Sequence, residues 1–297
     1  MVNPPHIPSW LARQYPFAPA SFVTPRGARL SYLDEGPRSG EAVLMLHGNP
    51  TWSFFYRNLV RELSSTMRCI APDHIGMGLS EKPPNYDYTL ATRIADIEAL
   101  MASLGLKQIH LVVHDWGGAI GFGFAAKHPE LIGRLLILNT AAFLSNDIPA
   151  RIAVCRMPGL GPLLVRGGNG FARPATWMAM SRRSLTAGEK RGYLFPYDTW
   201  ANRVAVNAFV QDIPLQPAHR SWPALAEGAA GLAQFQDRPA LIIWGGKDFC
   251  FTGRFLSRWQ KILPQAEVRL LADAGHYVLE DASEEAVPLA AGFLRQA

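Results

Sequence analysis

Asp115 is the residue whose type and surroundings point most directly to chemistry. It stands in the segment HDWGG (residues 114–118), between an apolar run at 109–113 and small residues at 117–127. A strand, a sharp turn and a helix in that order expose one side chain at the turn. A carboxylate there suits displacement at an sp³ carbon that bears a good leaving group, and such a displacement forms a covalent ester. An aspartate that only caps the following helix is the structural alternative.

His276 and Asp248 complete a set of side chains that would support a nucleophilic carboxylate. His276 lies in ADAGHYV near the end of the chain, and Asp248 closes WGGKD after another apolar run. The chain order nucleophile, acid, histidine is found in hydrolytic triads. In that arrangement the acid orients the imidazole and stabilises its charged form. A structural histidine and a surface-turn aspartate are the alternatives.

Other polar residues near these positions are weaker candidates. Asp273 competes with Asp248, but it stands only three residues before the histidine and fits a turn better. Glu280 and Asp281 are expected to be solvated. A related acid would be possible after the apolar run at 135–138, but the chain has Asn139 there. Asp248 is therefore the favoured acid.

Asn49 and Trp116 offer N–H groups close to Asp115. The turn HGNPTW (residues 47–52) follows an early apolar run at 42–46. In hydrolases whose nucleophile lies at a turn between a strand and a helix, an early turn and the residue after the nucleophile supply the backbone N–H groups of an oxyanion hole. The side-chain amide and the indole N–H add two donors suited to a departing halide. A turn former and a packing residue are the structural alternatives.

The elements that must position these residues alternate along the chain. Apolar runs typical of buried strands fall at residues 42–46, 67–71, 109–113, 135–138, 240–244 and 268–271. Residues 90–104 show the apolar spacing of a helix, and a last helix is expected near 284–295. This alternation predicts an α/β fold with a mostly parallel central sheet flanked by helices. Its sites lie at the carboxyl ends of the strands.

Residues 140–217 interrupt the alternation. They are rich in Gly, Pro, Met, Arg and aromatic residues and contain no long β-branched run. We expect several short helices that form a cap (lid), because so long an excursion is usually functional. The predicted division is a core domain of residues 1–139 and 218–297, with a helical cap at 140–217. A second small domain with no role in the site is the alternative.

Composition excludes several classes of protein. With 297 residues, 48% hydrophobic and 18% charged, the chain can bury a sizeable core. No run reaches the ~18 apolar residues of a membrane span, and residues 1–17 lack the apolar run of a signal peptide. Three scattered cysteines argue against a disulfide framework or a CxxC metal knuckle, and a cytoplasmic location is expected. The net charge of +5 is interspersed, so no nucleic-acid partner is expected.

Together these segments resemble the haloalkane dehalogenases and their near relatives in the α/β-hydrolase superfamily. The resemblance spans most of the chain and rests on HGNPTWSFFYRNL (47–59), PDHIGMGLS (72–80), HDWGG (114–118), WGGKDFCF (244–251) and GHYVLED (275–281). It implies an α/β-hydrolase fold with an inserted helical cap. It also implies that Asp115 is the nucleophile, His276 the base and Asp248 the acid. Asn49 and Trp116 match the halide-binding pair, and the whole set is similar to the third dehalogenase subfamily.

The resemblance implies dehalogenation of haloalkanes as the leading activity. Asp115 would displace halide, and water activated by His276 would then cleave the alkyl ester to give alcohol, halide and a proton. The same subfamily includes the β-lactone decarboxylases of bacterial long-chain olefin biosynthesis. The segments NTAAF, PGLG, GYLFPYDTW and FVQDIPL (within 139–215) resemble these decarboxylases at least as closely as the dehalogenases.

Two further activities are weaker alternatives. An epoxide hydrolase needs acidic donors in its cap, and Tyr193 and Tyr197 are the only tyrosines in residues 140–217. A hydrolase fold that serves as a non-catalytic binding module predicts a damaged triad. The expected ligand is a small apolar substrate, a haloalkane or a β-lactone, and no metal or organic cofactor is expected.

Overall fold

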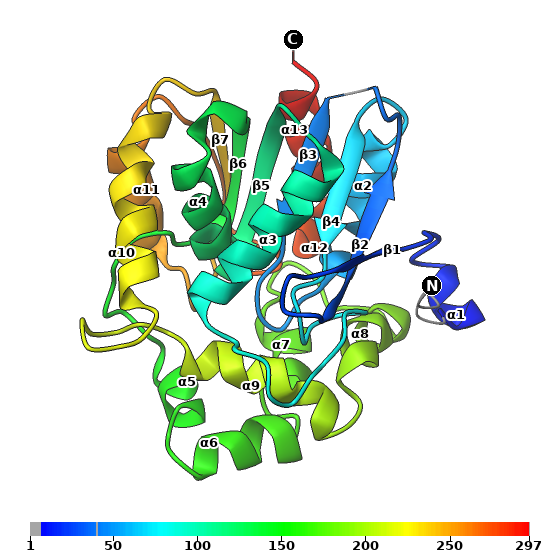
Figure 1. Ribbon diagram of the computed structural model, residues 1–297, viewed down its shortest axis with the longest axis vertical. Helices are drawn as coiled ribbons and strands as arrows, with labels where there is room; N and C mark the ends of the chain where they lie inside the picture. The colour runs from blue at the N-terminus through cyan, green and yellow to red at the C-terminus, as the bar shows by residue number, and fades with distance from the viewer. Residues whose placement is uncertain (1–6, 40, 297) are drawn as a thin grey trace.

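A single mixed sheet forms the centre of the molecule. The computed structural model describes residues 7–39 and 41–296 (Figure 1). Within these residues eight strands pair in the order β1-β2-β4-β3-β5-β6-β7-β8. They are β1 (Ala20–Val23), β2 (Arg29–Glu35), β3 (Ala42–Leu46), β4 (Arg68–Pro72), β5 (Ile109–Asp115), β6 (Ile132–Thr140), β7 (Ala240–Gly245) and β8 (Glu267–Leu271).

Six strands, β3 to β8, pair in parallel, and the first two pair antiparallel. The predicted α/β fold with a mostly parallel sheet is confirmed. The sequence pattern does not predict β1 and β2, because both include polar or charged residues and neither is a continuous apolar run. In contrast, every residue of β3, β4, β5 and β7 is buried, as expected for strands covered on both faces.

Helices cover both faces of this sheet (Figure 1). On one side, α3 (Leu90–Leu104), α4 (Trp116–Lys127) and α10 (Trp222–Gly231) pack against one another. On the other side, α2 (Arg57–Leu63) packs against α13 (Ser283–Leu294), and α12 (Val278–Asp281) lies beside it. Helix α11 (Gly253–Ile262) follows β7. The helix predicted at 90–104 is present with those bounds, because Thr89 caps its start and Gly105 ends it with a positive φ.

Short helices follow the end of β6, as expected for this part of the chain. They are α5 (Ala150–Cys155), α6 (Leu160–Pro162), α7 (Ala172–Met178), α8 (Ala187–Leu194) and α9 (Val204–Gln211). In Figure 1 they lie together beyond one end of the sheet. Their function as a cap remains a prediction.

Two other expectations concern the start of the chain and the membrane. The sequence of residues 1–17 shows no signal-peptide pattern. Residues 1–6 of this segment lie outside the described residues. None of the helices in the described part of the chain is long and apolar enough to cross a membrane.

Candidate active site

Asp115 stands at a sharp junction between β5 and α4. Its φ of 52° and ψ of −126° are unusual for a residue with a side chain. Two glycines make the junction possible. A Cβ on Gly117 would lie 1.9 Å from the carbonyl oxygen of Leu46, and one on Gly48 would lie 2.0 Å from Asp115 Oδ1. The Asp115 side chain makes no capping hydrogen bond to α4, so its orientation is not explained by the capping alternative.

The two carboxylate oxygens of Asp115 have different surroundings. Oδ1 accepts a hydrogen bond from the backbone N–H of Asn49 at 2.6 Å. Oδ2 lies 3.6 Å from His276 Nε2. Burial raises the pKa of Asp115, while His276 and the backbone N–H groups of Asn49 and Trp116 oppose that rise. One oxygen is therefore held by the backbone, and the other remains available.

His276 is oriented by Asp248. Its Nδ1 donates to Asp248 Oδ2 at 2.7 Å, so Nε2 faces Asp115. The other Asp248 oxygen accepts the backbone N–H groups of Cys250 at 2.6 Å and Phe251 at 3.0 Å. Burial alone would lower the pKa of His276, but Asp248 and Asp115 raise it above its ordinary value. The structure thus brings together the three residues predicted as a triad.

Asn139 supports this arrangement, and sequence reasoning missed it. Asn139 follows the apolar run predicted as a strand at 135–138. From the sequence we note there only that the residue is not an acid, and we assign Asn139 no role. Its Nδ2 donates to Asp248 Oδ2 at 2.9 Å, and its Oδ1 accepts the N–H of Gly245 at 2.8 Å. The signal that would have found Asn139 is its place at the end of β6, since β6 pairs with the strand that leads to Asp248.

The expectation that Glu280 and Asp281 are solvated is wrong. Their side chains are buried, with 1% and 2% of each residue exposed. Glu280 pairs with Arg57 at 2.5 Å, and Asp281 accepts the backbone N–H groups of Gly275 at 2.6 Å and Ser181 at 2.8 Å. Arg57 and Ser181 are far from these carboxylates in the sequence, and Gly275 lies in the preceding loop. The residues next to Glu280 and Asp281 in the sequence therefore do not reveal these partners. Asp281 thereby holds the loop that carries the candidate histidine.

Three further ionisable groups lie near the site but do not line its cavities. Asp273, the competing acid, is exposed and pairs with Arg182 at 2.7 Å. His114 is buried, and its Nε2 donates to the carbonyl oxygen of His276 at 2.9 Å. Burial lowers the pKa of His47 to about 4, so that ring is neutral near pH 7. Among residues 7–39 and 41–296, no cluster of three or more His, Cys, Asp or Glu could hold a metal ion.

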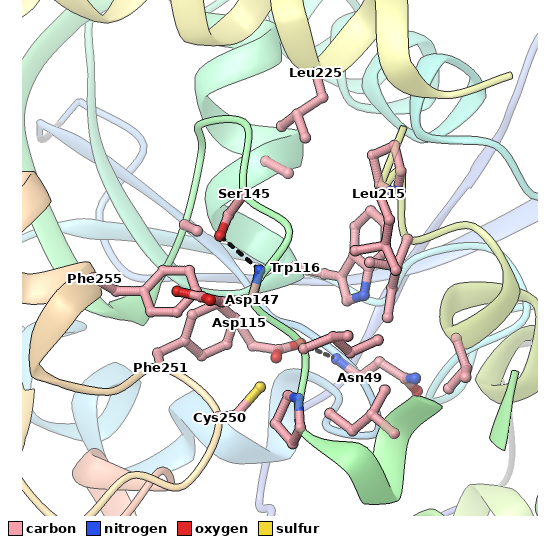
Figure 2. Close-up of a pocket in the computed structure, with 18 of the residues that line it drawn as sticks. Asn49, Asp115, Trp116, Ser145, Asp147, Leu215, Leu225, Cys250, Phe251 and Phe255 are labelled. Carbon is pink, nitrogen blue, oxygen red and sulfur yellow. Dashed lines mark hydrogen bonds between the residues drawn. The ribbon is translucent and has the colours of Figure 1, made fainter. Parts of the chain in front are cut away.

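Two apolar cavities meet at Asp115, with volumes of about 130 Å³ and about 280 Å³. The first, shown in Figure 2, extends toward α10, and we call it the α10 arm. The second extends along α7 past His276, and we call it the α7 arm. Five residues line both arms: Asn49, Asp115, Ile152, Phe171 and Cys250.

The predicted donor pair is only partly free for a ligand. Figure 2 shows Asn49 and Trp116 beside Asp115, and both line the α10 arm. The Asn49 amide donates one hydrogen bond to the carbonyl oxygen of Val206 at 3.1 Å. An amide nitrogen carries two hydrogens, so one donor remains. The ring of Trp116 packs edge-on against Phe209, with 5.3 Å between ring centroids.

A carboxylate on a strand–helix elbow, beside a histidine–aspartate pair, defines an α/β hydrolase. Comparison with known families agrees, because the family described as the alpha/beta hydrolase fold matches residues 41–283. The chain belongs to the α/β-hydrolase family, in the branch that contains haloalkane dehalogenases and their decarboxylase relatives, and it is an enzyme. The resemblance seen in the sequence is confirmed.

Individual relatives fall into two groups. A cis-3-alkyl-4-alkyloxetan-2-one decarboxylase of Xanthomonas campestris is 48% identical over 95% of this chain and 97% of its own. The enzyme of that name from Shewanella oneidensis is 49% identical over 90% and 85%. A haloalkane dehalogenase of Mycolicibacterium paratuberculosis is 31% identical over 88% and 85%. Among solved structures, a haloalkane dehalogenase of Bradyrhizobium elkani has a TM-score of 0.84 at 27% identity, covering 94% of this chain and 97% of its own.

Proposed function

We propose that this enzyme converts cis-3,4-dialkyl β-lactones to alkenes and CO₂, with Asp115 as the nucleophile. The observation that carries the proposal is the 48–49% identity to two decarboxylases of such lactones, against 31% to a haloalkane dehalogenase. The order of the two activities expected from the sequence is therefore reversed. A buried, apolar cavity at the carboxylate is compatible with a substrate made mostly of hydrocarbon.

The first step is a displacement at C4 of the lactone ring. Asp115 Oδ2, which lies 3.6 Å from His276 Nε2, attacks C4 from the side opposite the ring oxygen. A bond forms between Oδ2 and C4, the bond between C4 and the ring oxygen breaks, and the lactone carbonyl becomes a free carboxylate. The strain of the four-membered ring favours opening. The product is an alkyl ester of the enzyme.

The second step releases the alkene. The electrons of the C2–C3 bond form the C3=C4 double bond, CO₂ departs, and the bond between C4 and Asp115 breaks. The carboxylate of Asp115 is restored, and no water is consumed. Inversion at C4 places the ester opposite the departing carboxylate, so an anti elimination from a cis lactone gives a cis alkene.

The surrounding residues have matching roles in this scheme. The free N–H of the Asn49 amide and the Trp116 indole would stabilise the ring oxygen as it gains negative charge. His276, whose pKa is raised by Asp248 and Asp115, favours the imidazolium form that stabilises the returning carboxylate. Residues 140–217 act as the cap and keep water away from the ester, so that elimination outpaces hydrolysis.

Dehalogenation is the second candidate, because the same carboxylate, histidine and donors suit it and a dehalogenase shares this fold. The epoxide hydrolase alternative is disfavoured by two contacts. The hydroxyl of Tyr193 donates to Glu280 at 2.8 Å, and that of Tyr197 donates to the carbonyl oxygen of Thr51 at 3.1 Å. Neither tyrosine lines the cavities at Asp115.

The test compares two substrates on the purified enzyme. A synthetic cis-3,4-dialkyl β-lactone should give a cis alkene and one equivalent of CO₂, measured by gas chromatography. Asp115→Ala should lower the rate by about 10⁴-fold or more, as for other nucleophiles. Asp273→Ala, a change at an exposed carboxylate, is the matched control and should leave the rate unchanged. Halide release from 1-haloalkanes without any alkene from the lactone would refute the proposal.

A further inference from the structure

The two arms leave Asp115 in different directions and have different walls. The α10 arm is bounded by residues after α9 and on α10 and α11, among them Leu215, Leu225 and Phe255. The α7 arm is bounded by Ala175 and Met178 of α7 and by residues near the candidate histidine. These far walls are not shared, so each arm has its own end.

Both arms are apolar inside and polar only at a few positions. Ser145 and Asp147 line the α10 arm, and both are labelled in Figure 2. Arg151 is the cation among the residues that line the α7 arm, and its guanidinium lies over the Phe249 ring, 4.5 Å from the centroid. Hydrocarbon bound in either arm would leave water without stranding a buried, unpaired charge.

The residues that line both arms include the reactive carboxylate. Ile152 of α5 and Phe171, which precedes α7, line both cavities, as does Asp115. A ligand that fills both arms must therefore branch beside Asp115. A 3,4-disubstituted β-lactone branches in this way, because its two chains leave adjacent ring carbons, one of which is the carbon attacked. A 1-haloalkane has one chain and would fill one arm.

We propose that each arm binds one of the two alkyl chains of the lactone, so that separate residues set the length of each chain. Leu215 and Leu225 limit the chain in the α10 arm, and Ala175 and Met178 limit the chain in the α7 arm. The inference rests on the proposed function, and it adds that the two chain lengths are selected independently.

The experiment uses two cis lactones with opposite substitution, one with a long chain at C3 and methyl at C4, the other reversed, and a third with two short chains. Leu215→Trp narrows the α10 arm, and Ala175→Phe narrows the α7 arm. Each variant should lower kcat/KM by about tenfold or more for one long-chain lactone only, and the two variants should affect opposite lactones. On the short-chain lactone each variant should lose a smaller factor in kcat/KM than on the long-chain lactone that it impairs.

Matched controls place the same bulk on the outer surface of residues 140–217. Leu163→Trp and Ala153→Phe alter exposed side chains. Neither variant should change kcat/KM for either of the two long-chain lactones. If a narrowing variant also loses the short-chain lactone, Leu215→Ala and Met178→Ala serve instead. Each should then lengthen the longest chain accepted at one ring carbon only.

The outcomes separate the two proposals. If both narrowing variants impair the same long-chain lactone, one channel holds both chains and the two-arm inference is wrong. If neither impairs either lactone, the arms do not hold the chains, and it is also wrong. If the wild type converts no lactone of any length, the proposed function itself fails.

Discussion

The two carboxylate oxygens of Asp115 would have different roles in the proposed ester intermediate. Oδ1 is held by the Asn49 N–H at 2.6 Å, while Oδ2 faces His276 Nε2 at 3.6 Å. An ester formed on Oδ2 would keep its carbonyl oxygen in the position of an oxyanion hole. Water attack on that ester needs a base, whereas loss of CO₂ does not. The same residues thus allow hydrolysis or elimination, according to whether the bound group carries a carboxylate.

His276→Phe should separate these two outcomes. The variant should form an ester with a 1-haloalkane and accumulate it, because Phe cannot activate water. Intact-protein mass spectrometry should show one added alkyl group, mapped by digestion to Asp115. With a β-lactone the variant should still release alkene, more slowly, because elimination needs no water.

Isotope labelling provides the complementary control on the wild type. After many turnovers of lactone in ¹⁸O-water, Asp115 should remain unlabelled. Label in its carboxylate would mean that the ester is hydrolysed, and the decarboxylation scheme would then be wrong. An unmodified His276→Phe protein after exposure to several haloalkanes would count against dehalogenation as the second candidate activity.

At the scale of elements, the paired ends of β6 and β7 create the support for the histidine. Asn139 is the next-to-last residue of β6 and has a φ of 29°, a left-handed backbone conformation that asparagine tolerates better than most residues. From there its amide bridges Asp248 and Gly245. The carboxylate that orients His276 is therefore itself held by a neighbouring strand.

Asn139→Ala should weaken both stability and catalysis. It removes the hydrogen bonds to Asp248 and Gly245 and leaves buried groups unpaired, at a cost of about 1–3 kcal/mol in the free energy of unfolding. We expect kcat to fall about tenfold or more with a smaller change in KM, because His276 loses its fixed orientation. Urea unfolding and steady-state kinetics measure the two effects. Asn146→Ala, at an exposed position, is the control. If this variant lost as much stability and kcat as Asn139→Ala, the support proposed for Asn139 would be wrong.

At the scale of the whole molecule, burial of ionisable groups under residues 140–217 links stability to pH. Arg57 of α2 and Glu280 of α12 form a buried pair, and Arg183, from residues 140–217, joins Glu280 at 2.6 Å. Close to the site, His47 and His74 are also buried. His47 donates from Nδ1 to the Gly48 carbonyl oxygen at 2.7 Å and accepts the His74 N–H at Nε2 at 3.1 Å. The bond accepted at Nε2 requires the neutral ring, whereas Nδ1–H donates in either protonation state.

This burial predicts a pH dependence that His47→Gln should reduce. The folded-state pKa of His47 is about 4, below its unfolded value of about 6.5. The neutral ring stabilises the fold above pH 6.5, and that contribution is lost as the pH falls toward 4, because the unfolded chain then binds the extra proton. Between pH 7 and 5 the wild type should lose about 2 kcal/mol more than the variant.

Urea unfolding of both proteins at several pH values measures this difference. Glutamine keeps an acceptor for the His74 N–H, and the other titrating groups are common to both proteins. Between pH 8 and 9 the difference in free energy of unfolding between the two proteins should be constant. Parallel curves from pH 7 to 5 would show that His47 is not held neutral in the fold.

Much of the fold and the candidate site was predictable because local patterns carry it. Apolar runs of strand length identify most of the parallel sheet, since buried strands need no polar alternation. Gly117 and Gly118 after Asp115 signal a crowded elbow, and chain order connects it to Asp248 and His276. The structure brings these three side chains together. The site motifs resemble those of enzymes with two different activities, so the motifs alone leave the substrate open, and identity over the whole chain favours the lactone.

Only the tertiary structure decided the features that depend on residues distant in the chain. Glu280 and Asp281 look solvated in sequence, yet Arg57 and the backbone near Ser181 make their burial possible. Asn139 gains its role only because β6 and β7 lie side by side. The two arms likewise come from the packing of α5, α7 and α10 around one carboxylate. Periodicity reports which face of one element is buried, whereas the shape of a cavity depends on how several elements pack together.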